Sequence, residues 1–318
     1  MTASSTPALS VIVLVPDRFG TVAEVVSHLA AQDRRGEIEI VLVTPVDLDV
    51  PPDAMTGFQR WQTVRVPDWR STAQARAAGV AAAGSPIVAF VEDHCFPTPG
   101  WAHALVEAHR DDWVAVGPVI LNANPSYTIS WANLLIEYGP WLHPCEGGAR
   151  SHVPGHNSSY KRERLLAYGD RLPALLEAES VLHWDLGLQG FRLAIEPRAR
   201  SRHKNFARFW PSLRLRFQSG RLFAGSRALS WPASRRVVFA AGSPVLPFLR
   251  SWRLRASLRR HASPGRPLLA PLVFVLLVVD AIGEMVGYVS GPGAAIAAMN
   301  DLEFHRDRFT GPRTAVVS

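Results

Sequence analysis

The sequence predicts an α/β fold built on a mainly parallel sheet, followed by a basic, mostly helical C-terminal segment. Over roughly the first two hundred residues, short β-branched runs alternate with helical patterns, which is typical of a sheet with helices on both faces. From Pro197 to Val279 there is no Asp or Glu, but sixteen arginines and Lys204, giving a charge of +17. Because the whole chain of 318 residues has a net charge of +7, the remainder carries −10 and is mildly acidic.

The composition excludes several broad classes of protein. Hydrophobic residues make up 47% of the chain and charged residues 19%, so a sizeable core can form and a disordered chain is excluded. Cys95 and Cys145 are the two cysteines, which excludes a disulfide scaffold and favours a reducing compartment. No basic region precedes the apolar run at residues 11–15, so no signal peptide is expected. We therefore expect a cytoplasmic body.

Hydrophobic periodicity predicts the elements of the N-terminal part in order. Apolar or β-branched runs indicate buried strands, and apolar residues three and four apart indicate amphipathic helices. The segment 131–148 is predicted to be a loop rich in aromatic residues, and 155–169 a turn leading into a basic helix. The predicted strands are 9–15, 37–43, 63–66, 86–91, 113–121 and 191–195, and the predicted helices are 21–32, 71–83, 101–108 and 182–190.

The C-terminal part has the pattern of membrane-interface helices. Phe, Trp and Leu alternate with arginine in 206–224 and 245–260, as in helices that lie in the plane of a membrane surface. The apolar run 268–279 is only twelve residues long, whereas a spanning helix needs about 20. Extending it further would include Asp280 and Glu284. An embedded or in-plane helix is therefore expected, with a single span as the alternative.

Polar residues follow several of the predicted strands. In open α/β sheets ligands bind beyond the carboxyl ends of the strands, where Asp17, Thr44 and the Glu92–His94 cluster are expected to lie. Consecutive carboxylate and imidazole groups can hold a divalent cation, with substrate phosphates as further ligands. The alternative is that these residues form an acidic turn that caps the next helix.

Five segments together resemble the family 2 glycosyltransferases. AGSPIVAFVEDHCFPTPGW (83–101) resembles the apolar strand and acidic metal motif of that family. Four more segments resemble other parts of the family sequence and occur in the family's order. They are SVIVLVPDR (10–18), ARAAGVAAAG (75–84), VPGHNSSYKRERLLAYG (153–169) and AESVLHWDLGLQGFRLAIEPRARSRH (178–203). The resemblance covers about residues 10–203. It implies a GT-A fold and transfer of a sugar from a nucleotide-diphosphate sugar. The resemblance also implies that the transfer inverts the configuration at the anomeric carbon.

The resemblance also implies roles for individual residues. Glu179 matches the Asp of the family's Glu-Asp pair and is the expected catalytic base, which would take the proton of the acceptor hydroxyl. The expected ligands of Mn²⁺ (or Mg²⁺) are Glu92, His94 and His203. The residues expected to contact the donor or shape the pocket are Pro16, Asp17, Thr44, Arg76, Asp93, His156 and Asn157.

The sequence departs from the family pattern at four positions. His94 replaces a carboxylate and favours Mn²⁺ over Mg²⁺, while Ala77, Ala178 and Thr44 replace an Asn, a Glu and an acidic pair. These departures support one alternative, a catalytically degenerate member that serves as a membrane-bound scaffold or partner subunit. A second alternative is a nucleotidyl- or sugar-phosphate transferase, but that class starts with a Gly-rich basic loop, which is absent after Leu14.

The expected partners follow from both parts of the chain. The N-terminal domain (1–203) would bind the nucleotide sugar and a glycan or lipid-linked acceptor. The appendage (204–318) would bind an anionic membrane surface, because arginines meet anionic headgroups and the apolar run needs cover. Nucleic acid would explain the charge alone and is not expected. The predicted location is the cytoplasmic face of the cell membrane.

Overall fold

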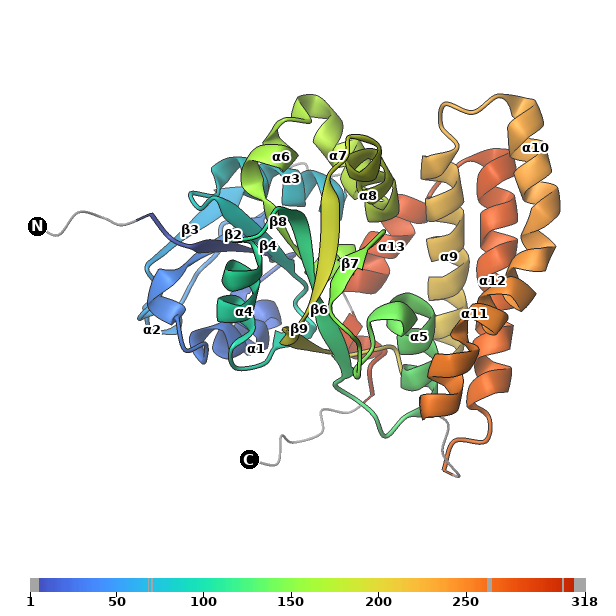
Figure 1. The fold of residues 1–318 in the computed structure, drawn as a ribbon, viewed down its shortest axis with the longest axis horizontal. Helices are drawn as coiled ribbons and strands as arrows, with labels where there is room; N and C mark the ends of the chain where they lie inside the picture. Colours follow the sequence, from blue (N-terminus) through green and yellow to red (C-terminus); the bar gives the residue numbers. More distant parts are fainter. Residues whose placement is uncertain (1–5, 68, 70, 262–264, 305, 312–318) are drawn as a thin grey trace, which may run out of the picture. The chain divides into compact units, whose positions relative to one another are not determined.

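The computed structural model describes a chain divided into two compact units (Figure 1). The first unit comprises Met1–Leu121 and His143–Arg202, and the second comprises Asn122–Leu142 and His203–Ser318. The second unit thus includes residues 122–142, a segment that lies within the predicted N-terminal domain. The residues described are 6–67, 69, 71–261, 265–304 and 306–311.

The N-terminal half of the first unit forms the parallel part of its sheet. Four strands pair in the order β3-β2-β1-β4, each parallel to its neighbour. The two central strands are buried along almost their whole length, which explains their continuous apolar sequences. The four strands are β1 (Leu9–Leu14), β2 (Ile38–Thr44), β3 (Arg60–Arg65) and β4 (Ile87–Val91).

The rest of the sheet includes antiparallel pairs, so the sheet is mixed and the expectation of a mainly parallel sheet is corrected. β8 (Ser159–Lys161) is antiparallel both to β4 and to β6 (Trp113–Asn122). β7 (Gly148–Arg150) is antiparallel to β9 (Arg192–His203), and β5 (Cys95–Pro97) completes the order β4-β8-β6-β9-β5.

Helices cover both sides of this sheet (Figure 1). Figure 1 shows α3 and α6 on one side and α1 and α4 on the other. Short helical elements occupy the connections. The helices of the first unit are α1 (Phe19–Ala30), α2 (Pro52–Met55), α3 (Thr72–Ala82), α4 (Trp101–Ala108), α6 (Arg162–Leu166), α7 (Leu172–Leu176) and α8 (Glu179–Leu188), with 3₁₀ turns η1 (Arg35–Glu37), η3 (Gly155–Asn157) and η4 (Gly169–Arg171).

Two further expectations for the first unit are corrected. The basic helix expected within 155–169 is reduced to α6, because the residues before it form η3 and β8. β9 runs for twelve residues to His203, whereas the sequence predicts a strand that ends at Ile195. Pairing with β7 and inclusion in the sheet carry the strand past Pro197, which local propensity treats as a stop.

The second unit is helical. α12 lies between α9 and α10 and contacts both (Figure 1). α5 occupies the segment predicted to be an aromatic loop, and α10 and α13 were not expected from the sequence. The helices are α5 (Thr128–Tyr138), α9 (Phe209–Arg227), α10 (Ala233–Gly242), α11 (Leu246–His261), α12 (Leu269–Ser290) and α13 (Ala295–Phe304), with 3₁₀ turns η2 (Gly139–Trp141), η5 (Ser243–Val245) and η6 (Arg306–Arg308).

α9 and α12 pack with their backbones nearly in contact. A Cβ atom on Gly283 would lie 2.2 Å from the carbonyl oxygen of Phe217, and one on Gly220 would lie 2.1 Å from the carbonyl oxygen of Asp280. Both distances are far below van der Waals contact, so only glycine permits this approach. Such small-residue contacts are also common between helices in membranes.

α12 has 22 residues rather than the predicted twelve, because its acidic residues have a partner. The guanidinium group of Arg250, on α11, forms ion pairs with both Asp280 and Glu284. By length and composition, α12 is the one helix in the described part of the chain that is apolar enough to cross a membrane. Of its most apolar window, 44% is buried inside the protein, so this property does not establish a location.

Candidate active site

Several of the predicted site residues lie at one edge of the parallel sheet. β1, β2 and β4 are neighbours and parallel, so their carboxyl ends meet at this edge. Asp17 follows β1 directly after Pro16, and its carboxylate accepts hydrogen bonds from the Thr21 hydroxyl (2.6 Å) and the Arg18 amide (2.8 Å). Thr44 ends β2, is fully buried, and accepts a hydrogen bond from the amide of Val46 (3.3 Å). These contacts fix the turns that precede the next elements.

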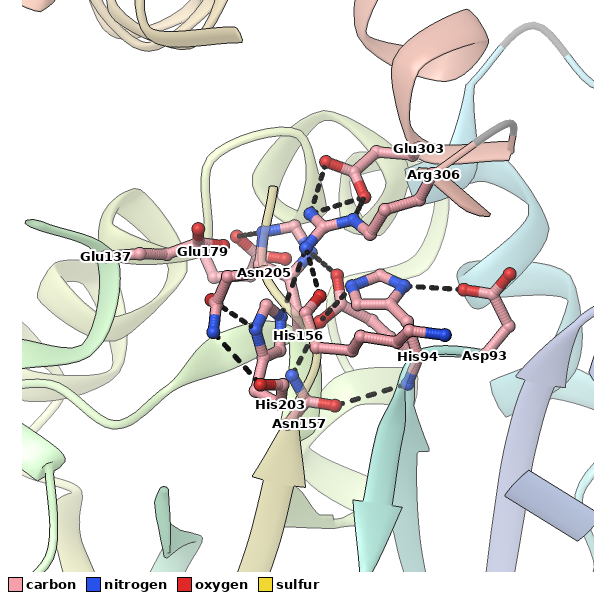
Figure 2. Close-up of polar contacts among 12 residues, drawn as sticks. Asp93, His94, Glu137, His156, Asn157, Glu179, His203, Asn205, Glu303 and Arg306 are labelled. Carbon is pink, nitrogen blue, oxygen red and sulfur yellow. Dashed lines mark hydrogen bonds and ion pairs between the residues drawn. The ribbon is translucent and has the colours of Figure 1, made fainter. Parts of the chain in front are cut away.

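The pairing of β4 with β8 brings η3 to the same edge. Ala89 lies opposite Ser159, and the next residues of the antiparallel register bring Glu92 to the turn that contains His156 and Asn157. The side-chain amide of Asn157 donates to Glu92 Oε2 (2.6 Å), and its oxygen accepts from the Glu92 amide (3.2 Å) (Figure 2). Asn157 therefore fixes both the backbone and the carboxylate of Glu92.

Glu179 is the first residue of α8 and belongs to a closed group of three charged or polar side chains. Arg76 Nη1 donates to Glu179 Oε1 (2.9 Å), and Arg76 Nη2 lies 2.7 Å from Nδ1 of His156. His156 Nε2 lies 3.1 Å from Glu179 Oε2. Because Arg76 can only donate, Nδ1 of His156 accepts and its Nε2 donates to Glu179. Each of the three side chains thus bonds to the other two.

The local structure explains how Arg76 and Glu179 come together. Arg76 projects from α3, whose first turn is capped by the Ser71 hydroxyl, which accepts from the Gln74 amide (3.2 Å). A Cβ atom on Gly155 would lie only 2.4 Å from Cβ of Glu179, so a glycine is needed where η3 crosses the start of α8. The guanidinium and carboxylate are both nearly buried, with side chains 6% and 9% exposed.

The charges around Glu179 determine its protonation state. Burial alone would raise the pKa of Glu179, but His156 and Arg76 outweigh it and hold this pKa at about 2. The neighbouring Glu177 shows the opposite shift, because burial raises the pKa of its carboxyl group. Of the two carboxyl groups, Glu179 is therefore the one held firmly in the ionised form.

His94 is oriented by the residue before it. Its Nδ1 lies 2.6 Å from Asp93 Oδ1, and its Nε2 lies 3.5 Å from Glu92 Oε2 (Figure 2). A carboxylate on Nδ1 selects the tautomer in which Nε2 carries the lone pair, an arrangement that is common for histidine ligands of metals. Glu92 Oε1 also lies 3.6 Å from His156 Nδ1, which joins this group to the Arg76–His156–Glu179 group.

His203 ends β9 and is fully buried in its own surroundings in the second unit. Its Nδ1 lies 2.8 Å from the side-chain oxygen of Asn205, and its Nε2 lies 3.5 Å from Arg306 Nη1 (Figure 2). Arg306 is also paired with Glu303 (2.8 Å). His203 thus resembles His94 in having an oxygen acceptor at Nδ1, so its Nε2 carries the lone pair, which faces Arg306 Nη1.

The donor set fits a divalent metal ion. By residue type, Glu92, His94 and His203 offer one carboxylate and two imidazole groups. Imidazole ligands suit Mn²⁺ better than Mg²⁺, which prefers oxygen. The oxygen acceptors on the Nδ1 atoms of both histidines supply the surrounding hydrogen bonds that such ligands require.

The structure joins most of the predicted residues of the first unit in one network. Arg76, Glu92, Asp93, His94, His156, Asn157 and Glu179 are linked by the contacts above, while Pro16, Asp17 and Thr44 lie along the same edge of the sheet. The sequence did not predict the Arg76–Glu179 ion pair or the contact of Arg306 with His203. The partners in each pair are 103 residues apart, and no spacing rule links them.

Comparisons with known proteins agree with this architecture. The chain is similar to the mannosyltransferase PcManGT from Pyrobaculum calidifontis, solved with GDP-Man and Mn²⁺, with 18% identity, a TM-score of 0.53, and coverage of 88% of this chain and 87% of that one. It is also similar to GalNAc-T7, solved with UDP, GalNAc and Mn²⁺, with 16% identity, a TM-score of 0.47, and coverage of 62% of this chain. It spans only 43% of the GalNAc-T7 chain. No curated protein matches.

The family model gives the assignment. The model of glycosyl transferase family 2 matches residues 10–168, which is half of the chain and includes β1, the Glu92–His94 cluster and η3. The likeness in fold to PcManGT extends over most of the chain. The protein therefore belongs to glycosyl transferase family 2, with a GT-A-like mixed α/β sheet and a helical C-terminal part.

Proposed function

We propose that this family 2 member transfers a sugar from a nucleotide-diphosphate sugar to an acceptor hydroxyl, with inversion at the anomeric carbon. The observation that carries the proposal is the buried, ionised Glu179 in contact with Arg76 and His156 at the ligand-binding edge of the sheet. A carboxylate held there by a cation has the chemistry needed to accept a proton near an anionic donor. Family membership supports the same reaction class.

We assign the other residues by their chemistry. Pro16, Asp17 and Thr44 would lie along the base and ribose of the donor, and Arg76, Asp93, His156 and Asn157 would border its diphosphate and the acceptor. Glu92, His94 and His203 would hold Mn²⁺, or less favourably Mg²⁺. When bound there, the ion would offset the negative charge of the diphosphate leaving group.

In the proposed step, the acceptor oxygen forms a bond to the anomeric carbon as the bond to the diphosphate oxygen breaks. The electron pair of the broken bond leaves with the nucleoside diphosphate, and the proton of the acceptor hydroxyl passes to Glu179. Attack from the face opposite the leaving group inverts the configuration.

Arg76 links donor binding to the basicity of Glu179. With a pKa of about 2, Glu179 is a weak base while it is paired with Arg76 and His156. A donor diphosphate that attracts the Arg76 guanidinium would weaken this pair. The pKa of Glu179 would then rise toward its ordinary value, and the carboxylate would become a better proton acceptor when the donor is present.

The division into a catalytic domain (1–203) and an appendage (204–318) is part of this proposal. The appendage would hold the enzyme at the cytoplasmic face of the membrane, where a glycan or lipid-linked acceptor is accessible. The second candidate function, a degenerate scaffold or partner subunit, is favoured by the departures at Thr44, Ala77, His94 and Ala178.

Donor turnover separates the two candidates. We expect the purified full chain, given a panel of nucleotide sugars and Mn²⁺, to hydrolyse or transfer at least one donor above background. The matching nucleoside diphosphate should also raise the melting temperature, because a ligand at 100 times its Kd stabilises a protein by about 2.7 kcal/mol. Binding without any turnover would support the scaffold.

The metal assignment predicts that nucleoside diphosphate binding depends on a divalent cation, with Mn²⁺ better than Mg²⁺. His94→Ala should weaken Mn²⁺-dependent binding by about tenfold or more in calorimetric titration, because an imidazole ligand is lost. His103→Ala, on the neighbouring α4, is the matched control and should bind as wild type. Equal binding in EDTA, or an unaffected His94→Ala variant, would reject the metal site.

A further inference from the structure

The helical unit exposes several large apolar side chains on two successive helices. Val237 and Val238 on α10, Val245 in η5, and Phe248 and Trp252 on α11 are each more than 60% exposed. We call these five residues the α10–α11 face. Single exposed apolar side chains are common on protein surfaces, but a cluster of them on consecutive elements indicates a surface that binds another molecule or a membrane.

This face continues onto α12. The ring of Phe248 contacts the ring of Phe274 on α12, with centroids 5.3 Å apart. Beyond Phe274, four exposed apolar side chains of α12 recur at helical spacing along one stripe. The most exposed members of this stripe are Val275, Ile282, Met285 and Val289.

The face of α12 opposite this stripe packs inside the protein. Gly283 touches the backbone of α9, and Asp280 and Glu284 are buried in ion pairs with Arg250. A helix that spanned a bilayer alone would have to give up these contacts. The outward stripe and the α10–α11 face are instead available while the helices remain packed together.

Exposed arginine side chains accompany these apolar residues on α11. Arg253, Arg255, Arg259 and Arg260 of α11 are exposed, and the Arg255 guanidinium lies 4.2 Å from the centre of the Trp252 ring. Neither α10 nor α11 contains an acidic residue. These two helices thus expose apolar side chains and arginines together, with no exposed carboxylate on either helix to pair with a cation.

We propose that the α10–α11 face docks onto a lipid bilayer rich in anionic headgroups, with Phe248 and Trp252 inserted among the acyl chains and the arginines of α11 at the phosphates. This inference rests on the proposed function, since it names the membrane surface at which that enzyme works. Nucleic acid would leave the apolar centre uncovered. A second copy of this chain would bring two positive surfaces together without any compensating acid.

Vesicle co-sedimentation of the full chain tests the proposal. We expect binding to vesicles that contain phosphatidylglycerol, weak binding to phosphatidylcholine alone, and weaker binding as salt is raised. The double variant Phe248→Glu/Trp252→Glu should bind at least about tenfold more weakly, because charges replace two aromatic side chains that would insert into the bilayer. Each Arg→Gln change at Arg253 or Arg259 should weaken binding to anionic vesicles by roughly fivefold.

Leu188→Glu is the matched control, because Leu188 is 88% exposed but lies on α8 in the first unit. It should bind vesicles as wild type. Nucleoside diphosphate binding and the melting temperature of every variant report whether the fold is intact. Vesicle binding that persists in the double variant would overturn the docking surface. So would a wild-type chain that binds neither kind of vesicle. Binding of RNA, or of a second copy of the chain, through this face would overturn it as well. Vesicle binding without any nucleotide binding would overturn the proposed function and leave the docking surface standing.

Discussion

Glu179→Gln is expected to reduce turnover by about 10²- to 10⁴-fold while leaving nucleoside diphosphate affinity within a few-fold of wild type. The amide keeps the shape of the side chain and can still accept a hydrogen bond from Arg76, but it cannot take a proton. The loss should therefore fall on kcat, measured under saturating donor, and not on the Kd measured by titration.

Two controls make this result specific to proton transfer. Glu177→Gln removes a neighbouring carboxyl group whose pKa burial raises, and we expect near-wild-type turnover. Glu179→Asp should recover part of the activity, because a carboxylate is restored one methylene further back. If Glu179→Gln turned over at near-wild-type rates, Glu179 would not be the base.

The sequence predicted the site best where its residues follow one another closely along the chain. Glu92, Asp93 and His94 stand directly after a buried strand, so the polar cluster and its place at the sheet edge could be inferred from hydrophobicity alone. Glu179 and His203 could be identified only by resemblance to the family. Periodicity carries no information about residues whose function depends on contacts far along the chain.

The residues that orient the site were harder to predict for the same physical reason. Asn157 reaches Glu92 because β8 pairs antiparallel with β4, and this pairing lies in a segment whose basic residues suggest a helix. The resemblance assigns Arg76 to the donor, and the ion pair that the structure shows between Arg76 and Glu179 could not be read from the sequence. Both contacts depend on tertiary structure, and in β8 strand pairing also overrides the local helical propensity.

The helical unit shows a similar limit. Asp280 and Glu284 made an apolar run appear to end after twelve residues, because an isolated carboxylate in a helix core is unfavourable. Arg250, thirty residues earlier than Asp280, reduces that cost by pairing with both carboxylates. Arg250 contributes to the positive charge from which a basic surface was predicted, but it forms its ion pairs inside the helical bundle.

Gly155→Ala is expected to lower turnover by about 10²-fold, although residue 155 itself carries no reactive group. Its new Cβ would lie 2.4 Å from Cβ and 2.6 Å from Cγ of Glu179, so the first residue of α8 must move. A displacement of about 1 Å in a reacting group can cost about 10²-fold in rate. His156 and Asn157 belong to the same 3₁₀ turn and would shift with it.

Gly187→Ala tests whether that loss comes from crowding at Glu179 rather than from any change on α8. Gly187 lies two turns further along the same helix, and a Cβ there meets no atom within 4 Å. Replacing an exposed helical glycine by alanine should stabilise the protein by up to about 1 kcal/mol and leave kcat unchanged. If Gly155→Ala instead kept full activity with an unchanged melting temperature, the close approach of η3 to α8 would not hold the carboxylate, and the placement of Glu179 by Gly155 would be refuted.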